Sequence, residues 1–316
     1  MKKAFVLLIL TILGVSYAQT CEDGFRAFEH FTGTTCVPDN PQRIVTLHDT
    51  NILVTLLELG VVPVGSAGQI NDNGMFFRTA SQFDTSQVEH IGRYRSPDPE
   101  AVAALEPDLI IATKWDDIES FELLAPTVVI DVHEVPLEDA MLQMADLVNE
   151  TEQALELQAE LNARVEAARE QLGEDFAKTT ISILQQNEVG WDSFYAKLPG
   201  HSVGLIRRAL EPTLTPAEDR FWTEREPKSL EALQEHAADV IFYYGWDTDE
   251  SGNSELFDAF LAEPLVQLLP AAQAGQIFNV VNHDGYGATW GMVTAELENY
   301  LDALTQPDLN RDLVQE

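Results

Sequence analysis

Two stretches decide the fold of this chain: EAVAALEPDLIIATKWD at residues 100–116 and EALQEHAADVIFYYGWD at residues 231–247. Laid over each other without gaps, they share Glu, Ala, Asp, Ile, Trp and Asp at equivalent places. Each reads as a helix, a turn and a buried strand, with Trp-Asp beyond the end of the strand. The repeat predicts two similar lobes, each with its own small parallel sheet. Chance is the alternative, because helix–strand units share a common composition.

Apolar runs of the same kind recur on both sides of these stretches. They are four to six residues long and rich in Val and Ile, as buried parallel strands are. Helical patterns alternate with them, which predicts an α/β fold. The expected strands lie at 43–47, 61–65, 108–112, 127–132, 180–184, 239–244 and 277–281, and the expected helices near 50–59, 99–105, 202–210, 229–236, 254–262 and 289–304.

The middle of the chain differs, because residues 137–173 carry only a helical pattern. Asn149 followed by Glu152 resembles a capping box, so we expect one helix near 137–148 and a longer one near 151–172. The longer helix would extend over about 33 Å. A helix of this length can bridge two lobes and limit their movement.

The composition is that of a globular protein, with 45% hydrophobic and 22% charged residues. The chain has 316 residues and 53 Asp and Glu against 18 Lys and Arg, a formal net charge of −35. So acidic a chain is not expected to bind nucleic acid or an anionic membrane, because both need clustered Lys and Arg.

The N-terminus has the pattern of a secretory signal peptide. Lys2 and Lys3 precede an apolar stretch from Ala4 to Val15, and Ser16-Tyr17-Ala18 resembles a cleavage site. We therefore expect residues 1–18 to direct export and to be removed. A retained anchor is the alternative.

Cys21 and Cys36 are the only cysteines. In an exported chain this pair predicts one disulfide, worth about 3 kcal/mol in the chain-entropy model. Lipidation of Cys21 is the alternative, although the preceding residues 17–20 depart from the usual lipoprotein pattern.

Six motifs in order resemble the iron-siderophore family of bacterial substrate-binding proteins, over nearly all of residues 30–304. They are Pro41-Gln42-Arg43-Ile44-Val45, the Leu-Gly-Val-Val-Pro-Val-Gly turn at 59–65, Ser96-Pro97-Asp98-Pro99-Glu100, Glu106-Pro107-Asp108-Leu109-Ile110, Ala125-Pro126-Thr127-Val128 and Gly275-Gln276-Ile277-Phe278-Asn279-Val280.

The resemblance implies a class III substrate-binding protein, in which two Rossmann-like lobes are joined by a long rigid interlobe helix. The expected parts are a signal peptide (1–18), an N-terminal lobe (19–136), the interlobe helix (137–176) and a C-terminal lobe (177–316). A monomer in the periplasm would deliver a ferric siderophore, haem or cobalamin to an inner-membrane ABC transporter. It would contact the membrane only through the permease, with Glu100 and Glu231 docking on it, and would need no cofactor. Both glutamates also suit the first turn of a helix.

Ligands of open α/β sheets bind beyond the carboxyl ends of the strands, so Trp115 and Trp246 are expected to face a shared cleft. A ferric siderophore suits aromatic walls and Arg donors. His283 with Tyr286 could contact the iron, whereas His48 reads as a loop residue that forms hydrogen bonds. The candidate ligand-binding residues are Arg93, Tyr94, Arg95, Lys114, Trp115, Tyr195, Arg220, Trp222, Tyr244, Trp246, His283, Tyr286 and Trp290.

Basic residues gather in two windows and predict a locally positive cleft, although Arg207 and Arg208 fit a solvated helix face better. The windows contain Arg78, Arg93, Arg95 and Lys114 in the first lobe, and Lys197, Arg207, Arg208, Arg220, Arg225 and Lys228 in the second.

Two other functions are alternatives. Gly200-His201-Ser202-Val203-Gly204 matches the nucleophile elbow of a secreted α/β-hydrolase, but Pro199 is a poor end for the central strand that an elbow requires. A direct zinc or manganese carrier needs converging His and carboxylate ligands, and the seven His show no paired spacing. His133-Glu134 begins a zincin-like motif, but Leu137 stands where its second His should be.

Overall fold

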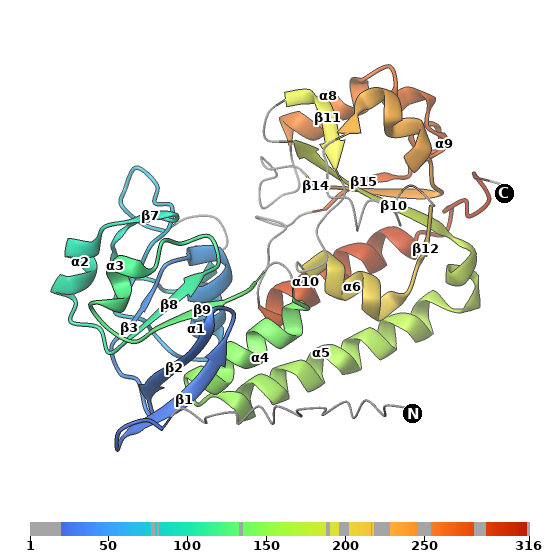
Figure 1. Cartoon of the computed structure of the whole chain (residues 1–316). Coiled ribbons are helices and arrows are strands. Elements are labelled where there is room, and N and C mark those ends of the chain that lie inside the picture. The colour runs from blue at the N-terminus through green and yellow to red at the C-terminus, as the bar shows by residue number, and fades with distance from the viewer. Residues whose placement is uncertain are drawn as a thin grey trace, which may run out of the picture.

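The computed structural model describes residues 20–76, 80, 82–132, 135–187, 190–195, 202–215, 217, 228–244, 254–280 and 289–314. Two sheet-containing lobes lie at opposite ends of a layer of helices (Figure 1). Among the described helices, none combines the length and the apolar character needed to cross a membrane.

The N-terminal lobe is built on a five-stranded parallel sheet whose strand order is β5-β4-β3-β8-β9. The strands β3, β8 and β9 are buried on every residue, as their continuous apolar runs predict. The strands are β3 (Ile44–Thr46), β4 (Gly65–Ser66), β5 (Glu89–His90), β8 (Leu109–Thr113) and β9 (Thr127–Ile130). The helices are η1 (Asp49–Leu53), α1 (Val54–Glu58), α2 (Pro99–Ala104) and α3 (Glu119–Glu122).

The C-terminal lobe has a mixed sheet, with the order β13-β11-β10-β14-β15 and with β12 paired to the start of β10. Four strands are parallel, whereas β11 pairs antiparallel with β10 and with β13. The predicted parallel sheet is therefore present in this lobe, with the antiparallel β11 as an unpredicted addition. The strands are β10 (Thr180–Asn187), β11 (Gly190–Tyr195), β12 (Thr213–Leu214), β13 (Lys228–Ser229), β14 (Val240–Tyr244) and β15 (Ile277–Asn279). The helices are α6 (Ser202–Leu210), η4 (Leu230–His236), α8 (Glu255–Ala262), η5 (Val266–Leu268), α9 (Pro270–Gln273) and α10 (Trp290–Leu304).

The sequence repeat corresponds to one structural unit in each lobe. α2 leads into β8 and the 3₁₀ helix η4 leads into β14, and each strand is the fourth of its sheet. In both copies the shared aspartate accepts hydrogen bonds from residues at the start of the neighbouring strand. Asp108 accepts hydrogen bonds from the backbone N–H groups of Gln42 and Arg43 before β3, and Asp239 accepts them from Thr180 at the start of β10.

The central stretch forms the two predicted helices, α4 (Leu137–Leu147) and α5 (Thr151–Leu172), followed by η3 (Glu174–Lys178). The predicted capping box is wrong. Glu150 precedes α5 without a side-chain cap, and Asn149 has a φ of 65° and donates its amide to the carbonyl of Asp39. Asn tolerates this left-handed conformation, which separates the two helices.

The two lobes share packing through these helices. α10 and α6 of the C-terminal lobe pack on α5, and α1 of the N-terminal lobe packs on α4. One apolar cluster contains β3 and β8 residues from one lobe and β10 and β14 residues from the other. Glu58 at the end of α1 also accepts hydrogen bonds from the N–H groups of Trp290 (2.8 Å) and Gly291 (2.7 Å) at the start of α10. A shared core and this tether oppose large lobe movements.

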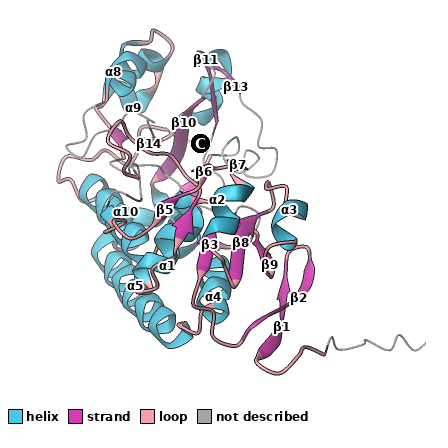
Figure 2. Cartoon of the chain, turned by 90° about the vertical axis from the view of Figure 1, so that its left-hand side faces the viewer, coloured by secondary structure: helices cyan, strands magenta, loops and turns pink. Residues whose placement is uncertain are grey.

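An unpredicted hairpin of β1 (Phe25–His30) and β2 (Gly33–Pro38) covers the free edge of β9 (Figure 2). The N–H of Phe31 donates to the carbonyl of Val129 (3.0 Å), and Arg26 pairs with Asp146 of α4. Covering an edge strand removes a site for unwanted pairing. The predicted disulfide between Cys21 and Cys36 is present.

Candidate ligand-binding site

The carboxyl ends of the five parallel strands lie along one edge of the N-terminal sheet. His48 and Asp49 follow β3, and Lys114 to Asp116 follow β8. Asp131 follows β9. In open α/β sheets this edge is where ligands bind.

A small hairpin brings further side chains to this edge. It consists of β6 (Gly92–Arg93) and β7 (Ser96–Pro97), with Tyr94 and Arg95 in the turn. Arg95 has a φ of 63°, so the turn holds it in the left-handed region that non-glycine residues rarely adopt. Its guanidinium lies 5.5 Å from the ring centroid of Trp115. The Tyr94 ring lies 5.5 Å from the His48 ring.

Trp115 is the most prominent ring of this group, with 52% of its surface exposed. The ammonium of Lys114 lies 5.0 Å from its ring centroid and 3.5 Å from the Asp131 carboxylate. The predicted residues Tyr94, Arg95, Lys114 and Trp115 are thus brought together. Arg93 is exposed on β6 next to them.

Asp116 fixes the turn that presents Trp115. Its carboxylate accepts hydrogen bonds from the N–H (2.8 Å) and the hydroxyl (2.9 Å) of Thr113. Burial raises the pKa of Asp116, and the Thr113 hydrogen bonds and the Arg95 charge oppose that rise. The turn is therefore held from within, independently of any ligand.

Asp49 connects the loops after β3 and β4. It is buried and accepts hydrogen bonds from the N–H groups of Thr50 (3.0 Å) and Gln69 (2.9 Å). A Cβ on Gly68 would lie 2.6 Å from its carboxylate, so only glycine fits there. His48 contacts the Thr50 hydroxyl at 3.3 Å, in keeping with its predicted role as a hydrogen-bonding loop residue.

Two predicted wall residues of the C-terminal lobe lie in its core instead. Tyr244 is 3% exposed, and its hydroxyl contacts Glu296 and Tyr300 of α10. Burial, followed by the Glu296 charge, raises the pKa of Tyr244 well above its ordinary value. Trp290 is 1% exposed at the start of α10. The prediction of both as ligand-wall residues is wrong, because strand and helix ends also supply the core.

The other predicted residues of this lobe lie at the edge of the described part of the chain or outside it. Tyr195 ends β11, whose backbone alone is described. The remaining residues lie outside the described part of the chain: Arg220, Trp222, Trp246, His283 and Tyr286. The segment 1–18 and His133-Glu134 lie outside it too.

Glu100 and Glu231 are both exposed in the first turns of the repeated helices, α2 and η4. Asp98 caps α2 by accepting from the N–H of Glu100 (2.9 Å). A hydrogen bond from the Ser229 side chain lowers the pKa of Glu231. Each helix runs back along its strand, so its first turn lies at the carboxyl edge of its sheet.

The structure does not support a nucleophile elbow. Ser202 is fully buried at the start of α6, and its hydroxyl donates to Glu296. The preceding strand, β11, is antiparallel to β10 rather than a central parallel strand. An elbow requires an exposed hydroxyl at the top of a parallel sheet.

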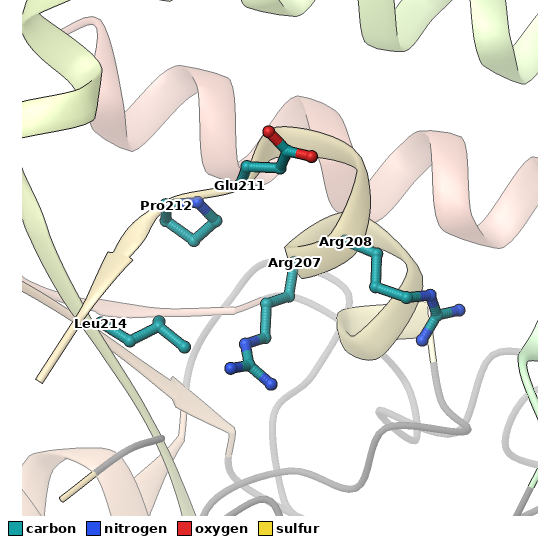
Figure 3. A pocket seen from close by; sticks show the side chains of 5 residues that line it. All are labelled: Arg207, Arg208, Glu211, Pro212 and Leu214. Atoms are coloured by element: carbon teal, nitrogen blue, oxygen red, sulfur yellow. The ribbon is translucent and has the colours of Figure 1, made fainter. Parts of the chain in front are cut away.

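A cavity of about 460 Å³ lies at the other end of α6 (Figure 3). The Arg207 and Arg208 side chains leave this helix in different directions, and Glu211 follows its last residue. Leu214 pairs with Ile181 at the beginning of β10, so this cavity is remote from the carboxyl ends of the strands. It is lined by Arg207, Arg208, Glu211, Pro212 and Leu214. Arg208 also pairs with Glu138 of α4 at 2.7 Å.

Within the described residues, no three His, Cys, Asp or Glu side chains converge as metal ligands would.

Phe31 at the tip of the β1–β2 hairpin lies beside this group of side chains and was not among the predicted residues. Its ring is 56% exposed, and its centroid lies 5.8 Å from the Lys114 ammonium. The hairpin carries it to the carboxyl end of β9 by pairing with Val129. No strand was predicted around Phe31, and the only available signal was the turn-forming Thr32-Gly33 that follows it.

A mixed α/β fold with two lobes and a loop cluster at the strand ends defines a bilobal solute-binding protein. The periplasmic binding protein family model matches residues 47–281, and the chain belongs to this family, which consists of binding proteins rather than enzymes.

Named relatives extend along most of the chain. The probable siderophore-binding lipoprotein YfiY of Bacillus subtilis is 25% identical and covers 89% of this chain and 91% of its own length. The ferric-anguibactin-binding protein FatB of Vibrio anguillarum is 24% identical and covers 84% of this chain and 83% of its own length. Staphylococcus aureus SirA, solved with staphyloferrin B, has a TM-score of 0.73 at 19% identity and covers 90% of this chain and 99% of SirA. The SirA similarity confirms the predicted class of fold.

Proposed function

We propose that this chain binds a ferric siderophore and delivers it to the permease of an ABC importer. The observation that carries the proposal is the group of Tyr94, Arg95, Lys114 and Trp115 at the carboxyl edge of a parallel sheet. Aromatic rings and Arg or Lys donors suit a bulky iron chelate with anionic oxygens. The names of the relatives YfiY and FatB support the same ligand class.

The ligand would lie between the lobes, with the N-terminal group as one wall. The opposite wall would come from predicted residues of the C-terminal lobe: Tyr195, Arg220, Trp222, Trp246, His283 and Tyr286. His283 with Tyr286 would be the pair able to contact iron. The shared core and the Glu58 tether favour a preformed site with little closure.

The proposal includes export and docking. Residues 1–18 would be a cleaved signal peptide, and the mature monomer would act in the periplasm without a cofactor. Glu100 and Glu231 would dock on the permease, one from each lobe, because both are exposed at equivalent helix starts.

Tryptophan fluorescence tests ligand binding, since ferric complexes quench nearby indoles. A panel of ferric siderophores, haem and cobalamin is titrated into the wild type, Trp115→Phe and Trp290→Phe. We expect quenching by at least one siderophore, a smaller quench in Trp115→Phe, and a wild-type binding curve in Trp290→Phe. Unchanged emission across the whole panel would overturn the proposal.

Docking is tested with Glu100→Arg and Glu231→Arg together. The double variant should bind ligand as the wild type does and fail to support iron uptake in cells that depend on this protein. Glu160→Arg, at an exposed position of α5, is the matched control and should support uptake. Normal uptake by the double variant would remove these glutamates from the proposed interface.

A further inference from the structure

The tip of the β1–β2 hairpin places an aromatic ring at the carboxyl edge of the N-terminal sheet. Phe31 is 56% exposed, and its ring centroid lies 5.8 Å from the Lys114 ammonium. The same ammonium lies 5.0 Å from the ring centroid of Trp115, which is 52% exposed. Both distances are within the range of a cation–π contact, so Lys114 connects the two exposed rings.

Phe31 extends a row of side chains along this edge of the sheet. Trp115 contacts the Lys114 ammonium and also the Arg95 guanidinium, which lies 5.5 Å from its ring centroid. The hairpin lies beside β9 (Figure 2), Trp115 follows β8, and Arg95 lies in the β6–β7 turn. The row therefore extends from the outer side of β9 to the β6–β7 turn.

Hydrogen bonds hold the hairpin tip against β9. The N–H of Phe31 donates to the carbonyl of Val129 (3.0 Å), and the N–H of Val129 donates to Nδ1 of His30 (3.3 Å). Nε2 of His30 contacts the Thr35 hydroxyl at 2.8 Å. Burial lowers the pKa of His30, and the Glu122 charge only partly opposes this. A neutral His30 can accept from Val129, so the tip is fixed without any ligand.

The Phe31 ring is not what anchors the hairpin to the protein. Phe28 and Val37 do this, since they are 4% and 0% exposed and belong to the shared apolar core. The hairpin therefore carries one ring into the core and presents another to the solvent. Packing a ligand against a ring whose backbone is already fixed costs little conformational entropy.

We propose that Phe31 is a ligand-contacting residue, whose ring packs next to Trp115 against the organic arms of the bound iron chelate. The inference rests on the proposed function and adds a residue of the N-terminal hairpin to the site. His30 is the positioning residue, because it acts on the ligand through the place that it gives to Phe31.

A set of ring variants tests the contact. Tryptophan quenching gives Kd for ferrioxamine B, ferric enterobactin, ferric citrate, haem and cobalamin, and the compound that binds the wild type most tightly is the probe. Phe31→Ala should raise its Kd about five-fold, because an aromatic contact is lost, and Phe31→Tyr should stay within about two-fold of the wild type. Phe25→Ala is the matched control, since it removes a 40% exposed ring from the other end of β1, and should leave Kd unchanged.

Urea denaturation of the same variants separates a ligand contact from a structural effect. Phe31→Ala should shift the urea midpoint no more than Phe25→Ala does, because Phe31 is the more exposed of the two. A loss of affinity that came with a larger shift, or that Phe25→Ala shared, would overturn the contact.

The outcomes also separate the inference from the function on which it rests. An unchanged Kd in Phe31→Ala would overturn the role of Phe31 and leave siderophore binding intact. Absence of quenching of the wild type by all of these compounds would overturn the proposed function itself.

A double-mutant cycle tests the positioning role of His30. His30→Ala should raise the Kd of the probe about two- to three-fold in the wild type and cause no further rise in Phe31→Ala, because the two residues act as one unit. Equal effects in both backgrounds, or no effect in the wild type, would show that His30 does not act through Phe31.

Discussion

Thr113 and Tyr244 occupy equivalent places in the two copies of the repeat, each as the last residue of its strand. The Thr113 hydroxyl donates to Asp116 in the following turn, so the N-terminal copy holds its own loop. The Tyr244 hydroxyl donates to Glu296 of α10, so the C-terminal copy holds a distant helix.

The difference explains why the two strand ends differ in exposure although their sequence patterns are similar. In the N-terminal lobe a small residue ends the strand, and the following turn places Trp115 in solvent. In the C-terminal lobe α10 covers the sheet. Tyr244 at the end of β14 packs in the core together with Trp290 and Tyr300 of α10. Trp115 is therefore exposed where we propose that ligand binds, whereas Tyr244 and Trp290 stabilise the core.

The two tryptophans test this contrast most strongly. Trp290→Ala should lower the free energy of unfolding by about 3–5 kcal/mol, because it empties a fully buried site. Trp115→Ala should change it by no more than about 0.5 kcal/mol, because half of that ring is already in water. Urea denaturation measures both, and similar losses in the two variants would contradict the assignment of one ring to the core and the other to the site.

The shared aspartates come next. Asp239 is buried and accepts hydrogen bonds from Thr180 and from the N–H groups of Leu313 and Val314. Asp239→Asn replaces one accepting carboxylate oxygen with an NH2 group, which would face hydrogen-bond donors. The variant should lose about 3 kcal/mol of unfolding free energy.

Asp108→Asn is the matched change in the other lobe and should cost about 1 kcal/mol, since its two hydrogen bonds are exposed to water. An equal or larger loss at Asp108 would show that the two copies do not differ as described. Both variants are compared by urea denaturation at one pH.

Much of the fold was predictable because the buried strands carry continuous apolar runs. The expected strand at 127–132 corresponds to Thr127–Ile130, and the break between α4 and α5 lies where it was expected. The β1–β2 hairpin and the antiparallel β11 were not predictable, because they are edge or cover elements whose residues are partly polar. The domain boundaries stay a prediction.

The site was half predictable for a similar reason. Position after a strand located Lys114 and Trp115, and the resemblance to the iron-siderophore family located Arg95. Position alone does not show whether a helix covers the strand end, which decided Tyr244. Nor does it show that a hairpin distant in sequence brings Phe31 to the same edge, since that depends on pairing with Val129.

Tyr244→Phe sharpens the comparison with a smaller change. It removes one hydroxyl from the buried Glu296 carboxylate and should cost about 2 kcal/mol of unfolding free energy. Thr113→Val removes the matching hydroxyl from the less buried Asp116 and should cost about 1 kcal/mol. Siderophore affinity should be unchanged in Tyr244→Phe; a large loss of affinity without a loss of stability would place this ring in the site after all.

The smallest effect concerns Glu58, where the lobes are tied to each other. Burial raises the pKa of its carboxyl, and the N–H groups of Gly291 and Trp290 only partly oppose this. A raised pKa means that the folded state binds the proton more tightly than the unfolded state does. The stability that this group contributes is therefore full below its ordinary pKa of 4.5 and falls as the pH rises through the folded-state value.

Glu58→Gln removes this titration and leaves one acceptor oxygen for the start of α10. The wild type should exceed the variant in unfolding free energy by more at about pH 4 than at about pH 7, measured by urea denaturation at both pH values. Glu160→Gln on exposed α5 should show no such pH dependence. If the difference in unfolding free energy between wild type and variant grew with pH, the expectation would be contradicted. The N-terminus of α10 would then stabilise the Glu58 carboxylate by more than burial destabilises it.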